Sequence, residues 1–314
     1  MTEALTDIFW VLIFPGFLFT GIVGLVASYI VRKVSALVQW RVGPPVRQPL
    51  TDILKLLGKE TLIPEEANRP VFMAAPLVGF AGVLLLSTLL WVTAFWPDKA
   101  FVGDIIVAIY LMVLPSLALI LGSSASASPH AAIGTSREMK LVLGYELPLV
   151  LAIIVVIIKS GGQLSLAAIA QQAPVLSISG MLAFLVSILC IQAKLGFIPF
   201  DMAEAETELG SGVYMEYSGG LLAVWKLMQA IMLVALPMFI VTVFMGGFGA
   251  SGLPLVWGIL KYVLVLVLVI LIKNTNPRVR IDHAMKFFWV YCGLILFIAV
   301  CLATIGSAWN INWL

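Results

Sequence analysis

Apolar residues form eight long stretches along the chain, separated by shorter segments that hold most of the polar residues. The stretches cover roughly residues 9–31, 71–95, 105–122, 141–158, 177–193, 219–245, 254–273 and 287–306. A helix needs about 20 apolar residues to cross a bilayer, and each stretch approaches that length. The stretches are continuous rather than alternating, which favours helices over a β-barrel. The pattern therefore predicts an all-α polytopic membrane protein with about eight transmembrane helices, and residues 1–314 form one integral membrane domain.

A short helix is predicted between the first two stretches. Gly43, Pro44 and Pro45 interrupt any helix that enters this segment. From residue 49 to residue 62, apolar residues recur at helical spacing and charged residues occupy the other faces. The apolar set is Leu50, Ile53, Leu54 and Leu57, and the charged set is Asp52, Lys55 and Lys59. This spacing predicts a short amphipathic helix lying at the membrane interface.

Composition supports the membrane assignment. Of the 314 residues, 62% are hydrophobic and 11% are charged, whereas about 25% of an average soluble protein is charged. A soluble globular domain and a disordered chain are both excluded. The N-terminus carries Glu3 and Asp7 where a cleavable signal would carry basic residues, so we expect a retained first span. The formal net charge of +2 gives no indication of nucleic-acid binding.

Most of the 18 basic residues lie on one side of the predicted helices. The connections 32–70, 123–140, 194–218 and 274–286, with the residues bordering them, contain Arg32, Lys33, Arg41, Arg47, Lys55, Lys59, Arg69, Arg137, Lys140, Lys194, Lys273, Arg278, Arg280 and Lys286. The opposite side has only Lys99 and Lys159. The positive-inside rule therefore places the four connections in the cytoplasm and both termini on the outer side. Because almost every acid shares this face, we expect it to dock a soluble partner; the alternative is an ordinary solvated face.

The connection after the fifth stretch is strongly acidic. It contains Asp201, Glu204, Glu206, Glu208 and Glu216. If residues 201–208 are helical, three of these acids share one face. Carboxylates this close repel one another, so some should have a raised pKa and exchange protons or bind cations. A two-metal carboxylate site lacks histidines, and a Mg²⁺ or Ca²⁺ site lacks a loop signature. The remaining alternative is a solvated loop that pairs with arginines on a neighbour.

Four more charged residues lie in or beside the apolar stretches. Thr135 or Ser136 is expected to cap the helix that follows, with Glu138 in its first turn. Glu146 lies deeper, where a carboxylate costs about 2.5–3.5 kcal/mol, so it should face a partner or a water path. It therefore serves either an ion pathway or a structural pair. Lys226 and Lys261 raise the same question, and both could instead extend toward an interface.

Residues that commonly hold redox metals are scarce. The chain has three cysteines and two histidines, and no two cysteines form a CxxC pair. This is too little for an iron–sulfur or zinc site within the chain, so any redox cofactor is expected on a partner. The last connection is basic and contains Arg278 and Arg280. It could balance the acidic connection or meet anionic lipid.

Several motifs occur in order, each at one of the four connections. They are RVGPP with DILKLLGKE, then GTSREM with YELP, then IPFDMAEAETELGSG with MEYSGG, and finally NTNPRVRIDHAMKFFW. Over essentially the whole chain they resemble the eight-helix membrane subunit beside the quinone site of respiratory complex I. They resemble more closely its counterpart in membrane-bound group 4 NiFe hydrogenases. In the quinone-reducing enzymes an Asn-Arg-Val-Gly run typically follows the first Gly-Pro, whereas here Pro45 to Pro49 follow it, which favours the hydrogenase-type branch.

The resemblance implies a non-catalytic membrane anchor that couples electron transfer to H⁺ or Na⁺ movement. It implies iron–sulfur clusters, and a NiFe centre in the hydrogenase-type complexes, on hydrogenase-like large and small subunits of a peripheral arm. Antiporter-like and small membrane subunits would be further partners in the cell membrane. The ion-coupling candidates are Glu138, Glu146, Asp201, Glu204, Glu206, Glu208, Glu216, Lys226 and Lys261. The partner-docking candidates are Arg41, Arg47, Arg137, Arg278 and Arg280.

Three other functions stay open at this point. The chain could be the quinone-site membrane subunit of a complex I-like NADH or ferredoxin dehydrogenase. It could be a stand-alone secondary transporter, although no internal repeat of the kind common in transporters is visible. It could also be a purely structural anchor.

Overall fold

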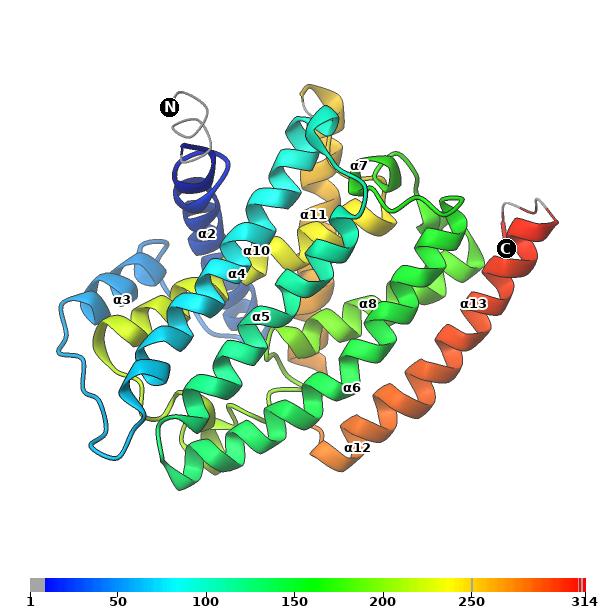
Figure 1. The fold of residues 1–314 in the computed structure, drawn as a ribbon. Helices are drawn as coiled ribbons and strands as arrows, with labels where there is room; N and C mark the ends of the chain where they lie inside the picture. Colours follow the sequence, from blue (N-terminus) through cyan, green and yellow to red (C-terminus); the bar gives the residue numbers. More distant parts are fainter. Residues whose placement is uncertain (1–8, 250, 310, 312) are drawn as a thin grey trace.

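The computed structural model describes residues 9–249, 251–309, 311 and 313–314, and these residues form helices joined by short connections (Figure 1). The long helices are α2 (Phe17–Val38), α4 (Arg69–Phe95), α5 (Asp104–Ser124), α6 (Pro129–Lys159), α8 (Ile178–Lys194), α10 (Gly219–Phe244) and α11 (Leu253–Thr275). The last helix begins as α12 (Ile281–Lys286), passes through wider π-type turns at Phe287–Cys292, and continues as α13 (Gly293–Ala308). Shorter helices are α3 (Gln48–Leu57), α7 (Leu166–Ile169) and α9 (Glu206–Leu209), and single 3₁₀ turns lie at Pro97–Lys99, Pro174–Leu176 and Gly212–Tyr214.

Each of the eight predicted apolar stretches forms a helix, so the predicted all-α membrane fold is confirmed. Seven of the helices found among the described residues are long and apolar enough to cross a membrane. The eighth, α8, has 17 residues and rises about 26 Å, slightly less than the thickness of a bilayer core. A bend of 105° separates α8 from the preceding segment Leu166–Leu176.

The predicted boundaries of three helices were wrong, because the last helix also begins at Ile281 and not near residue 287. Helix α2 continues to Val38 instead of ending near residue 31. Helix α6 begins at Pro129 rather than near residue 141, so neither Thr135 nor Ser136 caps it. The Thr135 hydroxyl instead donates to the Ala131 carbonyl oxygen, 2.7 Å away, inside the helix. Glu138 therefore lies well inside α6 and not in its first turn.

Gly134, which falls in the predicted connection 123–140, is a packing position within α6. A Cβ atom at Gly134 would lie 3.0 Å from the Ala203 carbonyl oxygen and 3.0 Å from the Val213 nitrogen. The missing side chain lets the connection after α8 lie directly against α6. This contact positions the acidic connection over the bundle.

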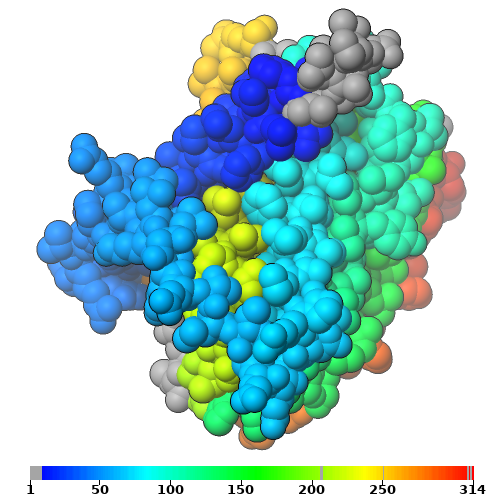
Figure 2. All heavy atoms as spheres, turned by 60° about the vertical axis from the view of Figure 1, so that its left-hand side comes forward, coloured from blue at the N-terminus to red at the C-terminus, as the bar shows by residue number. Residues whose placement is uncertain are grey.

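The predicted interfacial helix is present as α3, although it ends at Leu57 instead of near residue 62. Leu50, Leu54 and Leu57 are exposed on one face. On another face Asp52 accepts a hydrogen bond of 2.8 Å from Arg32 of α2. Figure 2 shows the connection that contains α3 standing out from the body of the molecule beside α2.

The four predicted charged connections lie on one side of the bundle. Three hydrogen bonds join them: Asn68 N donates to Ala125 O at 2.9 Å, Leu62 N donates to Ser218 Oγ at 2.8 Å, and Val279 N donates to Pro199 O at 3.1 Å. The predicted grouping of these segments is therefore confirmed. Helix α10 runs from this side through the centre of the bundle, where it packs against α2, α4 and α11.

Candidate functional site

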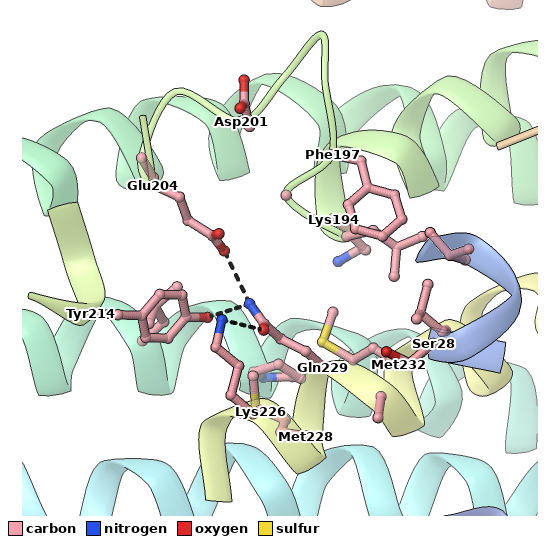
Figure 3. Close-up of a pocket in the computed structure, with 18 of the residues that line it drawn as sticks. Ser28, Lys194, Phe197, Asp201, Glu204, Tyr214, Lys226, Met228, Gln229 and Met232 are labelled. Carbon is pink, nitrogen blue, oxygen red and sulfur yellow. Dashed lines mark hydrogen bonds between the residues drawn. The ribbon is translucent and has the colours of Figure 1, made fainter. Parts of the chain in front are cut away.

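A cavity of about 500 Å³ lies beneath the acidic connection, between α2, α3, α6, α8, α10 and α11 (Figure 3). One part of its wall is apolar and includes Leu25, Val31, Ile53, Leu56, Met232 and Leu233. The other part is charged or polar and includes Arg32, Asp52, Glu138, Lys194, Asp201, Glu204, Tyr214, Lys226, Gln229, Lys273 and Arg278. The cavity therefore gathers ionisable side chains from segments that are far apart in the sequence.

An ion pair lies at the inner side of the cavity. The Lys194 ammonium of α8 donates to a Glu146 carboxylate oxygen of α6. The Lys194 side chain has 0% exposure and that of Glu146 has 20%. Lys194 also donates to the Met112 carbonyl oxygen at 3.2 Å. Both charges are thus compensated within the bundle, as a charge in an apolar environment requires.

Glu138 lies two helical turns before Glu146 on α6, about 12 Å along the helix axis. It is buried, with 9% of its surface exposed. Its charged neighbours are Glu204 of the acidic connection and Lys194. Glu138 therefore stands between the buried ion pair and the acidic connection.

Glu204 belongs to a hydrogen-bonded group at the outer side of the cavity. Its carboxylate accepts a hydrogen bond of 3.0 Å from Gln229 Nε2 of α10. The same nitrogen lies 3.2 Å from the Tyr214 hydroxyl, and Lys226 Nζ donates to Gln229 Oε1 at 3.2 Å. Figure 3 shows these three contacts meeting at Gln229. Glu146, Lys194, Glu138 and Glu204 thus form a charged row that leads from inside the bundle to the acidic connection.

The predicted helix over residues 201–208 was wrong. Residues 201–205 form turns, and α9 contains only Glu206–Leu209. Gly210, Ser211 and Gly212 all have positive φ angles, which end the helix. A Cβ atom at Gly212 would overlap the Ala203 carbonyl oxygen, so this tight turn requires glycine.

The acids of this connection consequently do not share a face. Asp201 pairs with Arg278 at 2.7 Å, Glu208 pairs with Arg137 at 2.8 Å, and Glu204 faces the cavity. Glu216 is half-buried and is not part of the cavity wall. The side chain of Glu206 lies outside the described residues.

The pKa of Glu208 is lowered, whereas a raised pKa was expected for acids crowded together. The hydrogen bond from Arg137 and the charge of that guanidinium hold the pKa of Glu208 below its ordinary value. Arg278 acts in the same direction. For Glu208 and Asp201, the structure matches the predicted alternative in which acids pair with arginines, and these arginines belong to the same chain.

The other predicted residues lie away from the cavity. Lys261 Nζ donates to the Met245 carbonyl oxygen at 2.5 Å, just after α10 and at the end opposite the acidic connection. Arg41 and Arg47 are exposed. Arg280 is also exposed and lies 3.9 Å from Asp282. These three arginines remain available to a partner on the face formed by the four connections.

Six of the charged and polar residues of the cavity wall were not among the predicted site residues: Arg32, Asp52, Lys194, Tyr214, Gln229 and Lys273. Lys273 Nζ lies 4.2 Å from the centre of the Phe197 ring. Gln229 follows Lys226 by three residues, so both lie on one face of α10. That spacing of two polar residues within an apolar stretch was the signal that could have identified Gln229.

A metal site was not predicted in this chain. Among the described residues, no group of three or more His, Cys, Asp and Glu side chains could hold a metal ion. Cys190, Cys292 and Cys301 are free. The placement of redox clusters on partner chains stays a prediction.

Comparisons with known proteins extend over nearly the whole chain. The model of a family described as NADH dehydrogenase matches residues 10–304. A subunit of the NADH-quinone oxidoreductase of Syntrophotalea carbinolica is 35% identical over 312 residues, which cover 92% of this chain and 93% of that protein. The subunit of the same name from Geobacillus kaustophilus is 32% identical over 292 residues, with 88% and 87% covered.

A solved structure is also similar to this fold. It is a chain of the membrane-bound sulfane sulfur reductase, described as an archaeal respiratory membrane complex. The two chains are 27% identical and superpose with a TM-score of 0.82, over 91% of this chain and 96% of the other. The arrangement of the helices is therefore shared by proteins of respiratory membrane complexes.

Proposed function

Because this chain belongs to the NADH dehydrogenase family, we propose that its charged cavity couples electron transfer in a docked arm to ion movement across the membrane. The chain is a membrane subunit of a multisubunit oxidoreductase. Within such a complex it would act as a non-catalytic anchor. The alternative of a stand-alone transporter is not favoured, because the relatives are named as subunits.

One observation carries this proposal. The row formed by Glu146, Lys194, Glu138 and Glu204 leads from inside the bundle to the face of the four connections. Charges interact strongly where little water screens them, so a change of charge at one end of the row alters the preferred protonation at the other end. A redox event in a partner on this face could thereby drive proton transfer along the row.

The exposed arginines on the face of the four connections indicate where partner subunits would bind. Arg41, Arg47 and Arg280 are exposed there and could bind acidic groups of a peripheral arm. We expect that arm to contain hydrogenase-like large and small subunits with iron–sulfur clusters, and a NiFe centre in the hydrogenase-type case. These cofactors would supply the electron transfer. Antiporter-like and small membrane subunits beside this chain would carry H⁺ or Na⁺.

The charge distribution supports an orientation. Fourteen of the 18 basic residues belong to or border the four connections, so we place this face in the cytoplasm and the termini on the outer side of the cell membrane. The peripheral arm would then lie in the cytoplasm. Labelling of single cysteines introduced at exposed positions 41 and 102 would test this orientation, because only one of them should react in sealed cells.

Glu204→Gln tests the coupling function. The intact complex, reconstituted in vesicles, would oxidise reduced methyl viologen with protons as the electron acceptor while H⁺ and Na⁺ uptake is measured. We expect the ions moved per electron to fall severalfold, with the complex still assembled. The matched control is Glu66→Gln, which removes an exposed carboxylate on the same face. An unchanged ratio in the assembled Glu204→Gln complex would contradict the proposal, and turnover that requires added quinone would favour the quinone-site alternative.

A further inference from the structure

Gln229 is the meeting point of three side chains at the outer side of the cavity. Its amide nitrogen lies 3.0 Å from Glu204 Oε1 and 3.2 Å from the Tyr214 hydroxyl. Its amide oxygen accepts the hydrogen bond of 3.2 Å from Lys226 Nζ. Gln229 thus joins α10 to the acidic connection through its amide nitrogen, while its amide oxygen contacts Lys226 of the same helix (Figure 3).

The neighbours determine which way the amide points. A lysine ammonium has only donors, so the group facing Lys226 must be the amide oxygen. A carboxylate has only acceptors, so the group facing Glu204 must be the amide nitrogen. The reversed amide would oppose donor to donor and acceptor to acceptor. The orientation of Gln229 is therefore imposed by the opposite charges of Lys226 and Glu204.

This orientation has two consequences for Glu204. A hydrogen bond donated to a carboxylate favours its charged form. The amide also transmits the polarising effect of the Lys226 charge, because the ammonium withdraws electron density from the amide oxygen. However, an amide has no proton that it exchanges readily near neutral pH, so protons do not pass between Glu204 and Lys226 through Gln229.

Other charged and titratable groups also face Glu204. They are Glu138 on α6, Lys194 on α8, Lys273 on α11, Tyr214 in the 3₁₀ turn, and Asp201 with Arg278 across the cavity wall. Gln229 donates a hydrogen bond of 3.0 Å to the Glu204 carboxylate from α10. This bond ties the direction of the Glu204 carboxylate to that helix.

We propose that Gln229 is a positioning residue that aims the charged Glu204 carboxylate into the cavity. This inference rests on the proposed coupling function, and it adds the residue that orients one carboxylate of the row. Lys226 acts on Glu204 through its charge, which the Gln229 amide transmits.

Two substitutions of Gln229 test the proposal. Gln229→Met has a similar shape but donates no hydrogen bond, and Gln229→Glu keeps the shape while it replaces the donor by a second titratable carboxyl. The matched control is Gln39→Met, which removes an exposed glutamine whose amide donates to Asn274 Oδ1. The protonation state of Glu204 would be read from its carboxylic acid C=O band in infrared spectra of the intact complex, and Glu204→Gln would identify the band.

In the Gln229→Met complex, we expect the Glu204 band to persist to a pH about one to two units higher than in the unsubstituted complex. The pH profile of ions moved per electron should shift in the same direction. Gln229→Glu should shift the band at least as far, because two neighbouring carboxyls share a proton. Gln39→Met should shift neither property.

The outcomes separate this inference from the proposed function. If Glu138→Gln lowers the ions moved per electron but neither Gln229 variant shifts the Glu204 band, then Gln229 does not position Glu204 and the inference is wrong while the coupling function stands. If the Glu204 band shifts but no variant of the row alters the number of ions moved per electron, then Gln229 positions Glu204 and the coupling function is wrong. A Gln229→Met complex that fails to assemble leaves Gln229→Glu to decide between these results.

Discussion

Lys194 on α8 and Glu146 on α6 form an ion pair inside the helix bundle, and the Lys194 side chain is entirely buried. The pair joins two helices that pack against each other and against α13. Removing one partner of such a pair leaves an uncompensated charge in an apolar environment, which is costly. The pair is therefore both a structural element and the inner end of the charged row.

Glu146→Gln should destabilise the protein because Lys194 would lose its partner. We expect a loss of about 3 kcal/mol, toward the lower end of the range for buried pairs, since Glu146 has 20% exposure. The free energy of unfolding in detergent would measure it. The double variant Glu146→Gln with Lys194→Met should recover much of the loss, and a double variant as unstable as the sum of the two single variants would contradict the pairing.

The contact between Glu208 and Arg137 should depend on pH. The pKa of Glu208 is below its ordinary value of 4.5 in the folded protein. A carboxylate with a lowered pKa stabilises the folded protein at pH values above its ordinary pKa. That stabilisation is lost as the pH falls through the lowered pKa. Hydrogen exchange of residues 206–210, corrected for its intrinsic pH dependence, should therefore be slow at neutral pH and accelerate below about pH 4.5.

The substitution Glu208→Gln should make hydrogen exchange of residues 206–210 fast at neutral pH, because it removes the negative charge that pairs with Arg137. Glu216→Gln is a control in the same connection, with no cavity contact. If exchange of residues 206–210 were equally slow in the Glu208→Gln variant, the ion pair would not be what holds this segment.

Asp201 and Arg278 should show coupled effects on stability. Their oxygen and nitrogen atoms are 2.7 Å apart, and Asp201 is mostly buried while Arg278 is partly exposed. Asp201→Asn and Arg278→Met should each cost about 1.5–3 kcal/mol, as hydrogen bonds between charged groups do. The double variant should cost little more than either single variant. Strictly additive losses in thermal unfolding of the complex would contradict a direct interaction.

Gly219 is required where α10 begins beside the first connection. Its φ angle is +55°, and a Cβ atom there would lie 2.6 Å from the Glu60 carbonyl oxygen. Gly219→Ala should therefore destabilise the protein by more than about 1 kcal/mol. The adjacent Gly220→Ala is a matched control, because its nearest neighbour would be 3.7 Å away. Equal unfolding temperatures for the two variants would contradict this packing.

The hydrophobic pattern predicted the helices well because each apolar stretch must be shielded from water whatever its neighbours are. Boundaries were harder to predict, since Gly134 falls in the predicted connection 123–140 but serves close packing against Ala203 in the fold. The charge pattern correctly grouped the four connections. It depends on a property of the whole connection and not on the conformation of any single residue.

The site was only partly predictable for a related reason. Glu138, Glu146, Glu204 and Lys226 stood out as charges in or beside apolar stretches, and the structure places all four in or beside the cavity. The sequence could not show that Asp201 and Glu208 pair with arginines from other connections, because those contacts join segments that are distant along the chain. Gln229 escaped notice because an uncharged side chain gives a weaker signal than a charge.

The decisive test of a coupling role for the cavity is the ratio of ions moved to electrons transferred by a complex carrying Glu138→Gln. Glu138 lies in the middle of the row, and Gln preserves its size while it removes the exchangeable proton. We expect the ratio to fall at least severalfold while the complex stays assembled and still oxidises reduced methyl viologen. A ratio equal to that of the unsubstituted complex, measured in the same vesicles, would contradict a coupling role for the cavity.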